Sequence, residues 1–270
     1  YTLDEIETIL KVAEDDPSNW QKTSLSHRCK RLAKTAALIR KKRANIIGLI
    51  TAITGKSIVE SDIEVSEAID FIEFYPRSLV KWETEKAMKS SPMGTGLIIS
   101  PWNFPFAIPC GGIVSSLVAG NTTILKPDPQ TLLIAQQLVN IFHEAGIPKP
   151  ALQIAPIRQI KLIQHLIESH TIKFITFTGR YETAQKIQKQ RPDIPFYAET
   201  GGKNTTIVTA MADKELAIQN IITSAFGFAG QKCSATSLVI LEKEVYHNPQ
   251  FKTQLINAIR TIKVGSPWDF

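Results

Sequence analysis

The chain of 270 residues is 43% apolar, so it can bury a substantial core in one large domain or in two of medium size. Its 31 basic and 25 acidic residues give a net charge of +6, and the basic excess is concentrated between residues 28 and 43 on a solvated helix face. We therefore expect a soluble globular protein with no nucleic acid and no membrane among its partners.

Cysteine usage is sparse. Three cysteines are too few and too scattered for a disulfide framework, and no two have the spacing of a zinc site. They are Cys29, Cys110 and Cys233. These features favour a cytoplasmic protein without a metal centre. The uncharged span 90–125 is long enough for a membrane helix, but prolines and glycines interrupt it and would leave its backbone unsatisfied in lipid.

Three helices are predicted in the first part of the chain, where apolar residues recur at spacings of three and four. They cover residues 3–14, about 24–53 and 60–82. The second ends at Gly55, a helix-stopping glycine. The third carries a buried stripe after an acidic opening. This stripe consists of Ile63, Ala68, Phe71 and Ile72, and Glu67 and Asp70 are expected to lie on it too.

From residue 96 onward, short apolar runs alternate with helical segments. Strands are predicted near 96–100, 122–126, 151–155, 172–177 and 205–209, and helices near 107–118, 129–144, 158–168 and 181–190. A helix at 213–226, a strand at 237–242 and a helix at 250–262 follow. Helices of this length can serve as the crossovers that parallel strands require, so the sequence predicts a parallel α/β fold.

Two strand ends offer groups for a cofactor. Lys126 closes one strand, and Asp128 and Pro129 open the next helix as its cap and first turn, which puts the lysine where open α/β sheets bind ligands. At the other, Thr178 and Gly179 lead into a helix whose free N–H groups could hold a pyrophosphate. Taken alone, a Thr-Gly turn is most often just a turn, and no GxGxxG pattern is present.

The segment 226–235, FGFAGQKCSA, places Cys233 among small residues, so that backbone N–H groups and a substrate carbonyl could approach its sulfur. The neighbouring Lys232 would favour the reactive thiolate slightly. A lone cysteine is most often a small buried hydrophobe. Two other groups strengthen the prediction of a thiol site: Glu199 before a glycine pair, as a candidate base, and Asn103 between an aromatic residue and two prolines, as a candidate amide donor.

Five segments in this order resemble the aldehyde dehydrogenase superfamily, and within it the L-glutamate γ-semialdehyde (1-pyrroline-5-carboxylate) dehydrogenases. The segments are SPWNFP, GNTTILKP, ITFTG, ETGGKN and SAFGFAGQKCSA, and the resemblance runs from about residue 20 to the end. It implies a Rossmann-like parallel-sheet cofactor domain and the first part of an α/β catalytic domain. It also implies oxidation of an aldehyde by NAD, or by NADP, through a thiohemiacetal and a thioester on cysteine, as the second step of proline catabolism.

The resemblance assigns a role to each matching position. The catalytic residues would be Cys233, Glu199 and Asn103. The cofactor-binding residues would be Ser100, Trp102, Lys126, Thr178, Gly179, Arg180 and Gly201. Ser234 would donate to the α-carboxylate of the substrate, and Glu67 would face its α-ammonium. The resemblance implies a small-molecule aldehyde substrate and, for the full-length protein, a homo-oligomer.

Three departures from the family pattern affect the cofactor site. Arg180 stands where the family usually has a small serine, and Pro129 stands where many NAD-preferring members have a carboxylate for the ribose. The segment 153–160, QIAPIRQI, lacks a glycine-rich loop that such enzymes often carry. NAD is therefore the expected cofactor, with NADP possible.

Two domains are expected: residues 1–198 as an NAD(P)-binding domain with N-terminal helices, and residues 199–270 as the N-terminal portion of a catalytic domain. The N-terminal segment YTLDEIE is typical of the middle of a helix, and family members are nearly twice as long, so the chain is expected to be truncated at both ends. The segments SEAIDF and RYETAQKIQ also resemble the bifunctional proline-utilisation proteins, in which a proline dehydrogenase domain comes first.

Other functions stay open at this point. An aldehyde dehydrogenase of different substrate range would share the same chemistry. A thiol hydrolase would pair its cysteine with a histidine, but the five histidines lie in surface-helix or loop contexts without a nearby signature. A dehydrogenase-like scaffold without catalysis is a further alternative, which titration of NAD into the full-length protein would distinguish.

Overall fold

The computed structural model describes residues 1–85 and 90–268. The chain forms two compact units, unit 1 over Tyr1–Glu199 and unit 2 over Thr200–Phe270. This division falls one residue after the domain boundary that the sequence suggested. Each unit is described by itself.

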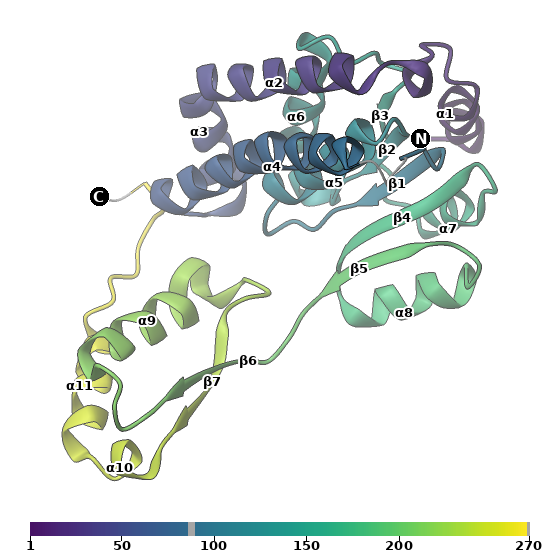
Figure 1. Cartoon of the computed structure of the whole chain (residues 1–270). Coiled ribbons are helices and arrows are strands. Elements are labelled where there is room, and N and C mark those ends of the chain that lie inside the picture. The colour runs from purple at the N-terminus through teal and green to yellow at the C-terminus, as the bar shows by residue number, and fades with distance from the viewer. Residues whose placement is uncertain (86–89, 269–270) are drawn as a thin grey trace. The chain divides into compact units, whose positions relative to one another are not determined.

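Unit 1 is built on a five-stranded sheet with the strand order β3-β2-β1-β4-β5 (Figure 1). Its strands are β1 (Thr95–Ile99), β2 (Thr122–Lys126), β3 (Leu152–Ile154), β4 (Ile172–Gly179) and β5 (Phe196–Thr200). Strand β1 pairs in parallel with both β2 and β4, and β2 pairs in parallel with β3. The predicted parallel α/β arrangement is confirmed, whereas β5 was not predicted.

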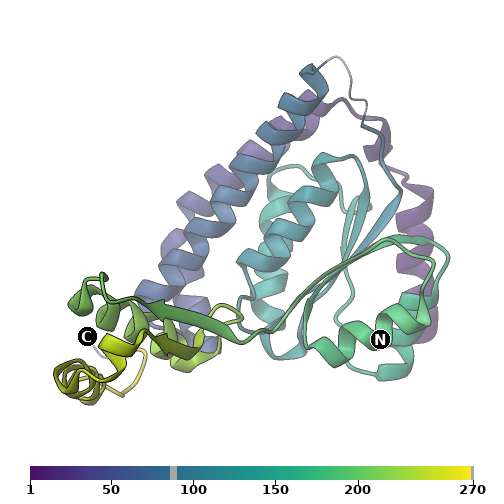
Figure 2. The same cartoon turned by 60° about the horizontal axis from the view of Figure 1, so that its bottom comes forward.

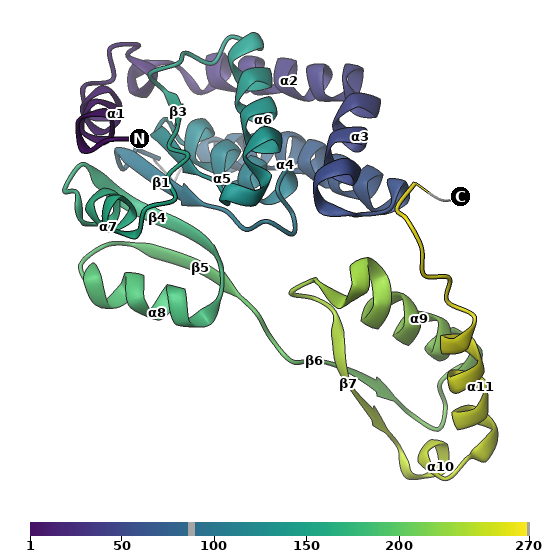
Figure 3. The same ribbon diagram turned by 180° about the vertical axis from the view of Figure 1, so that it is seen from behind.

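Helices cover both faces of this sheet because its strands alternate their side chains between two cores. The sheet helices are α5 (Ala107–Val118), α6 (Leu132–Glu144, after a 3₁₀ turn at Pro129–Thr131), α7 (Ile160–Glu168) and α8 (Tyr181–Gln190). In β1, Ile98 packs into the core that contains α5 and α6, while Leu97 and Ile99 pack into the core that contains α7 and α8. Figure 3 shows α6 and α7 from behind.

The N-terminal helices add a third group of elements to unit 1. They are α1 (Leu3–Asp15), the 3₁₀ turn Trp20–Lys22, α2 (Leu25–Lys41), α3 (Arg43–Thr54) and α4 (Ile58–Thr84). The single helix predicted over 24–53 is wrong, because Lys42 leaves the helical conformation (φ −97°, ψ 9°) and separates α2 from α3. Gly55 ends α3 in the left-handed region, as predicted.

Helix α4 runs alongside α5 (Figure 2), and its buried face differs from the predicted one. Ala68 and Ile72 are buried as predicted, but Ile63 is 62% exposed and Glu67 and Asp70 are also exposed. Instead Glu64 is fully buried. The buried face of α4 therefore differs from the predicted one. It includes the carboxylate of Glu64, whereas its neighbour Ile63 faces solvent.

Unit 2 contains a two-stranded parallel sheet of β6 and β7 against helices. Its elements are β6 (Asn204–Val208), α9 (Lys214–Phe226), the 3₁₀ turn Gly227–Gly230, β7 (Thr236–Leu241), α10 (Lys243–Tyr246) and α11 (Pro249–Arg260). The core of unit 2 comprises Val208, Ile218, Ile221, Val245 and Phe251. Among the described residues, no helix combines the length and hydropathy that crossing a membrane requires, and no cluster of three or more His, Cys, Asp or Glu could hold a metal ion.

Candidate active site

The carboxyl ends of three neighbouring strands form one edge of the sheet in unit 1. Ile99 of β1 lies opposite Lys126 of β2 on one side and Phe177 of β4 on the other. Directly after β1, the backbone N–H of Ser100 donates to the carbonyl of Lys126 across 3.2 Å. The structure thus brings Ser100, Lys126 and Thr178 to the same edge, where open α/β sheets bind ligands.

Lys126 lies half-buried at this edge. Burial lowers the pKa of its ammonium, and the neighbouring Asp128 partly opposes that shift. The Asp128 side chain also accepts from the backbone N–H of Gln130 at 2.9 Å and so caps the turn that begins at Pro129, as predicted. An ammonium that has lost part of its hydration gains more from a phosphate or hydroxyl oxygen than one in open solvent does.

Gly179 ends β4 and Arg180 occupies the N-cap position of α8. A Cβ on Gly179 would come within 2.7 Å of the Phe177 ring, and Phe177 is only 3% exposed, so packing alone favours glycine there. Arg180 is exposed and its side chain makes no capping hydrogen bond to the helix. The first turn of α8 therefore begins without a side-chain cap, which suits an anion.

The segment 100–106 leaves the same sheet edge and carries Trp102 and Asn103, both partly buried, toward α5. Helix α5 lacks a side-chain cap at its N-cap residue Phe106. A distant group takes that role, because Glu64 Oε1 accepts from the backbone N–H groups of Phe106 at 2.8 Å and Ala107 at 3.2 Å.

Glu64 is itself paired with a buried cation. Its Oε2 lies 2.5 Å from Lys56 Nζ, and the side chains are 0% and 1% exposed. The same Nζ lies 3.6 Å from the centre of the Phe104 ring, a cation–π contact. Sequence reasoning missed both residues, because the partners of Glu64 are backbone amides more than 40 positions away and no local spacing signals them.

Glu67 lies one turn further along α4 and is exposed. Partial desolvation, followed by the negative charge of Glu64, raises the pKa of the Glu67 carboxyl, while Lys56 lowers it. Glu67 therefore holds its proton more tightly than an ordinary surface glutamate does.

Cys233 lies in unit 2 on the segment between the 3₁₀ turn and β7, and it is exposed. Cys110 is fully buried, and burial raises the pKa of its thiol well above the ordinary value. Cys29 is half-buried, and desolvation raises its pKa as well. Of the three thiols, Cys233 is the one that a substrate in solution can reach.

The backbone before Cys233 has an unusual conformation. Phe228, Ala229 and Gly230 lie in the left-handed region, with φ values of 50°, 53° and 73°. Two of these residues are not glycine, and such strain persists only where the surrounding structure enforces it. The Phe228 side chain is buried with 7% exposure and so fixes the turn from within.

Asn204 holds the backbone on the other side of the thiol. Its side-chain amide donates to the carbonyl of Cys233 and, at 3.3 Å, to that of Ala235. Sequence reasoning did not single out Asn204, although it closes the ETGGKN segment. Ser234 is exposed beside the thiol, and no atom lies within 4 Å of a Cβ built on Gly201, so packing does not explain that glycine.

Glu199 lies on β5, and its side chain is exposed. Strand β5 neighbours β4, whose carboxyl end carries Thr178 and Gly179. The remaining predicted residues divide between the units, with Asn103 and the cofactor-edge residues in unit 1 and Gly201, Cys233 and Ser234 in unit 2.

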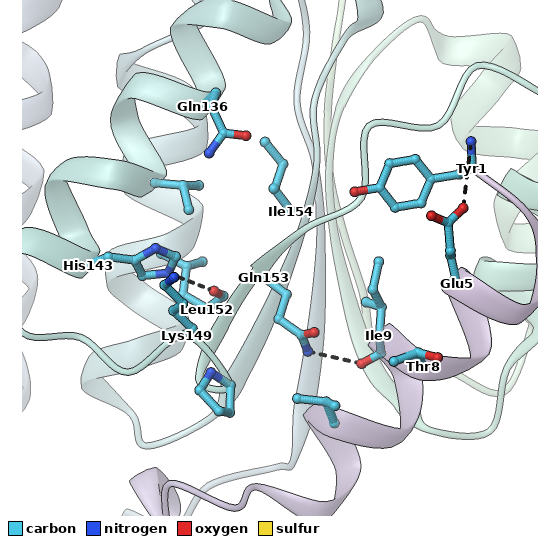
Figure 4. Close-up of a pocket in the computed structure, with 13 residues that line it drawn as sticks. Tyr1, Glu5, Thr8, Ile9, Gln136, His143, Lys149, Leu152, Gln153 and Ile154 are labelled. Atoms are coloured by element: carbon cyan, nitrogen blue, oxygen red, sulfur yellow. Dashed lines mark hydrogen bonds and ion pairs between the residues drawn. The ribbon is translucent and has the colours of Figure 1, made fainter.

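A pocket elsewhere in unit 1 lies between α1, α6 and β3 (Figure 4). Two of its polar side chains are engaged by the protein itself: Gln153 donates to the carbonyl of Ile9 at 2.9 Å, and His143 Nε2 lies 3.0 Å from the carbonyl oxygen of Leu152. Desolvation lowers the pKa of His143, so the ring is neutral near pH 7. None of the predicted site residues lines this pocket.

The chain matches the aldehyde dehydrogenase family over residues 1–270. It is 37% identical to a 1-pyrroline-5-carboxylate dehydrogenase of Geobacillus sp. (strain WCH70), an alignment that covers 97% of this chain and 54% of that protein. The chain therefore spans about half the length of the curated relatives it matches.

Two solved structures are similar over nearly the whole chain. A 1-pyrroline-5-carboxylate dehydrogenase from Thermus with bound NAD is 33% identical, with a TM-score of 0.89 over 98% of this chain and 55% of that one. Proline utilization A from Corynebacterium freiburgense is 36% identical, with a TM-score of 0.90 over 98% of this chain and 27% of that one. The resemblance expected from the sequence segments is confirmed, and the chain belongs to the aldehyde dehydrogenase family.

Proposed function

We propose that the protein containing this chain oxidises L-glutamate γ-semialdehyde to L-glutamate with NAD, in the second step of proline catabolism. The observation that carries the proposal is the exposed Cys233 shortly after a strained turn, in a chain that matches a 1-pyrroline-5-carboxylate dehydrogenase over 97% of its own length. The full-length protein is the polypeptide that carries residues 1–270 in the cell.

In the proposed mechanism the Cys233 thiolate adds to the aldehyde carbon and forms a thiohemiacetal. The carbonyl oxygen becomes an oxyanion, to which the Asn103 side-chain amide and the Cys233 backbone N–H donate. Asn204 supports this role because it binds the carbonyl of Cys233 and so restrains the backbone next to the reacting sulfur.

Loss of hydride leaves an acyl group on the sulfur as a thioester. Glu199 removes a proton from the water that attacks this thioester, and the products are the carboxylic acid and the regenerated thiol. The exposed position of Glu199 supports this role because the carboxylate can reach water, and no atom lies within 4 Å of a Cβ built on Gly201, two residues later.

The residues at the carboxyl edge of the sheet fit a dinucleotide. The half-buried Lys126 suits a ribose hydroxyl or phosphate, and the uncapped first turn of α8 suits a pyrophosphate. Ser100, Trp102, Thr178, Gly179, Arg180 and Gly201 would complete the site. When bound, NAD supplies the hydride acceptor. NADP stays an alternative, because Pro129 offers no carboxylate to the ribose.

For the substrate, Ser234 would donate to the α-carboxylate, and Glu67 would pair with the α-ammonium. Both side chains are exposed, which supports contact with a ligand. In terms of domains, we assign cofactor binding to unit 1 and the first part of the catalytic domain to unit 2.

Three free thiols support a cytoplasmic location. Homo-oligomerisation of the full-length protein stays a prediction.

The first test replaces the nucleophile in the full-length protein. Cys233→Ala should lower the rate of semialdehyde oxidation to less than a few per cent of wild type, because no other described thiol is exposed. The matched control is Cys29→Ala, which should retain nearly full activity. NADH formation followed at 340 nm is the measurement, and substantial turnover by Cys233→Ala would refute the proposed nucleophile.

A catalytically impaired scaffold is the second candidate, favoured by Arg180 and Pro129 at the cofactor edge. Titration of NAD and NADP into the Cys233→Ala protein separates the two functions, because a scaffold need not bind either dinucleotide.

A further inference from the structure

We propose that Lys56 and Glu64 are positioning residues that hold Asn103 in place by anchoring the chain directly after it at two points, the Phe104 ring and the start of α5. The inference rests on the proposed function for its kinetic consequence. It goes beyond that function by assigning a role to a buried ion pair that is not among the predicted site residues.

The anchor farther from Asn103 along the chain is the start of α5. Glu64 accepts hydrogen bonds from the backbone N–H groups of Phe106 and Ala107, which lie three and four positions after Asn103. A Ser, Asp or Asn at the N-cap would satisfy such amides locally. A carboxylate from α4 does more, because it fixes the helix start relative to a second helix.

The anchor nearer Asn103 is the aromatic residue that follows it. The Lys56 ammonium lies 3.6 Å from the centre of the Phe104 ring and 2.5 Å from Glu64. One cation therefore joins the adjacent ring to the carboxylate that caps α5. Asn103 therefore directly precedes two points of the chain that are fixed to the same ion pair, which restricts its position.

Burial makes these interactions strong and their loss costly. Lys56 and Glu64 are 1% and 0% exposed, so water cannot replace a missing partner. A buried ion pair is weak evidence for net stability, since well-packed apolar residues often stabilise as well. Apolar residues could not hold the segment that carries Asn103 in this way, because they cannot accept hydrogen bonds from the backbone N–H groups of Phe106 and Ala107.

Rate depends steeply on such geometry. A misplacement of about 1 Å can cost roughly a hundredfold in rate, and removal of one oxyanion donor costs about a hundredfold or more. Loosening the segment without removing Asn103 should therefore have a smaller effect than Asn103→Ala, and no additional effect once Asn103 is absent.

The first arm of the experiment needs no activity. Hydrogen exchange of the full-length Glu64→Gln protein should be faster than wild type at the amides of residues 101–107, of which all but Pro101 and Pro105 carry an amide hydrogen. Phe104→Leu keeps the ion pair and the helix cap, so it tests the ring contact even where Glu64→Gln fails to fold. It should accelerate exchange at residues 101–105. Unchanged exchange at residues 101–105 in Phe104→Leu would overturn the proposal.

The matched control loosens the opposite end of the same helix. Arg28 is buried and donates to the carbonyls of Val118 at 2.8 Å and Thr23 at 2.5 Å. Arg28→Met should lower the melting temperature but leave exchange at residues 101–107 and the kcat/KM for semialdehyde within about twofold of wild type.

The second arm is a double-mutant cycle on kcat/KM at saturating NAD. We expect Asn103→Ala to lose about a hundredfold and Glu64→Gln or Phe104→Leu about tenfold. Each double variant with Asn103→Ala should also lose about a hundredfold, with the Kd for NAD unchanged. Losses that multiply to about a thousandfold would overturn the role through Asn103.

The proposed function and the proposed anchoring of Asn103 can be refuted separately. If the wild-type protein oxidises no aldehyde, the proposed function fails by itself. Exchange in Phe104→Leu then decides whether the pair holds the segment, with acceleration at residues 101–105 supporting the anchor and unchanged exchange refuting it.

Discussion

At the scale of single residues, the candidate site combines strained backbone, exposed reactive groups and buried charge. Cys233 is accessible, whereas burial raises the pKa of Cys110 and keeps that thiol inert. The ion pair between Lys56 and Glu64 shows the opposite situation, in which charged groups are buried. Glu64 is buried and paired, and its negative charge helps to raise the pKa of the exposed Glu67.

The raised pKa of Glu67 predicts a pH dependence of substrate binding. Only the carboxylate attracts an ammonium, and a raised pKa means that the carboxylate is lost earlier as pH falls. The KM for semialdehyde should therefore rise as pH falls through the Glu67 pKa, by roughly tenfold in total, as for loss of one charge-assisted hydrogen bond.

The measurement is KM against pH for wild type and Glu67→Gln in parallel. Both proteins are measured in the same substrate solution, so the difference between their KM profiles reports on Glu67 alone. The variant should show a raised KM without this dependence. Two superimposable profiles would mean that Glu67 does not contact the substrate.

At the scale of elements, much of unit 1 was predictable. The strand 122–126 and the helices 107–118 and 181–190 have the predicted bounds, because apolar runs and helical spacing are local signals. Strand β5 gave no such signal, since Tyr197, Ala198 and Glu199 are exposed and the strand depends on pairing with β4.

The α4 face was mispredicted for a different reason. Periodicity cannot distinguish an exposed apolar residue such as Ile63 from a buried one, nor a buried glutamate from a solvated one. The burial of Glu64 depends on Lys56 and on the start of α5, which only the folded chain brings together. The candidate catalytic residues were identified through resemblance, while their supports Asn204, Lys56 and Glu64 required the structure.

Close packing of α5 on β1 yields a stability prediction. A Cβ on Gly112 would come within 2.6 Å of Ile98 Cγ2, and Ile98 is only 2% exposed. Gly112→Ala should therefore destabilise the protein by about 1–3 kcal/mol through overpacking.

Gly48 on α3 provides the control, because no atom lies within 4 Å of its added Cβ. Gly48→Ala should be neutral or stabilising by up to about 1 kcal/mol, since alanine restricts the unfolded chain. Urea denaturation of the two variants is the measurement, and equal midpoints would contradict the packing shown between α5 and β1.

At the scale of the whole molecule, residues 1–270 form two units and span about half the length of their relatives. One face of the β6–β7 sheet exposes large apolar residues. Ile207 is 69% exposed, and it lies opposite Ile240, which is 49% exposed. Leu238 on the same face is 51% exposed.

The polypeptide 1–270 by itself should bind NAD through unit 1, oxidise no semialdehyde and self-associate through this apolar face. Sedimentation velocity measures the association. Ile207→Glu with Ile240→Lys should reduce it, because the two positions face each other and would form a cross-strand ion pair. Robust turnover by this polypeptide would show that residues 1–270 suffice for catalysis.

If the exposed Cys233 and the Ser234 beside it serve an amino-acid aldehyde, the ratio of two specificity constants should show it. A site built to bind a carboxylate and an ammonium rejects an analogue that lacks them, because its own polar groups are then unpaired. The full-length protein should prefer L-glutamate γ-semialdehyde over an unsubstituted aliphatic aldehyde of similar length by at least about a hundredfold in kcat/KM, or about 2.7 kcal/mol. Ser234→Ala should shrink this ratio by slowing the amino-acid substrate. Comparable kcat/KM values for the two aldehydes, or a ratio unchanged by Ser234→Ala, would contradict the substrate assignment.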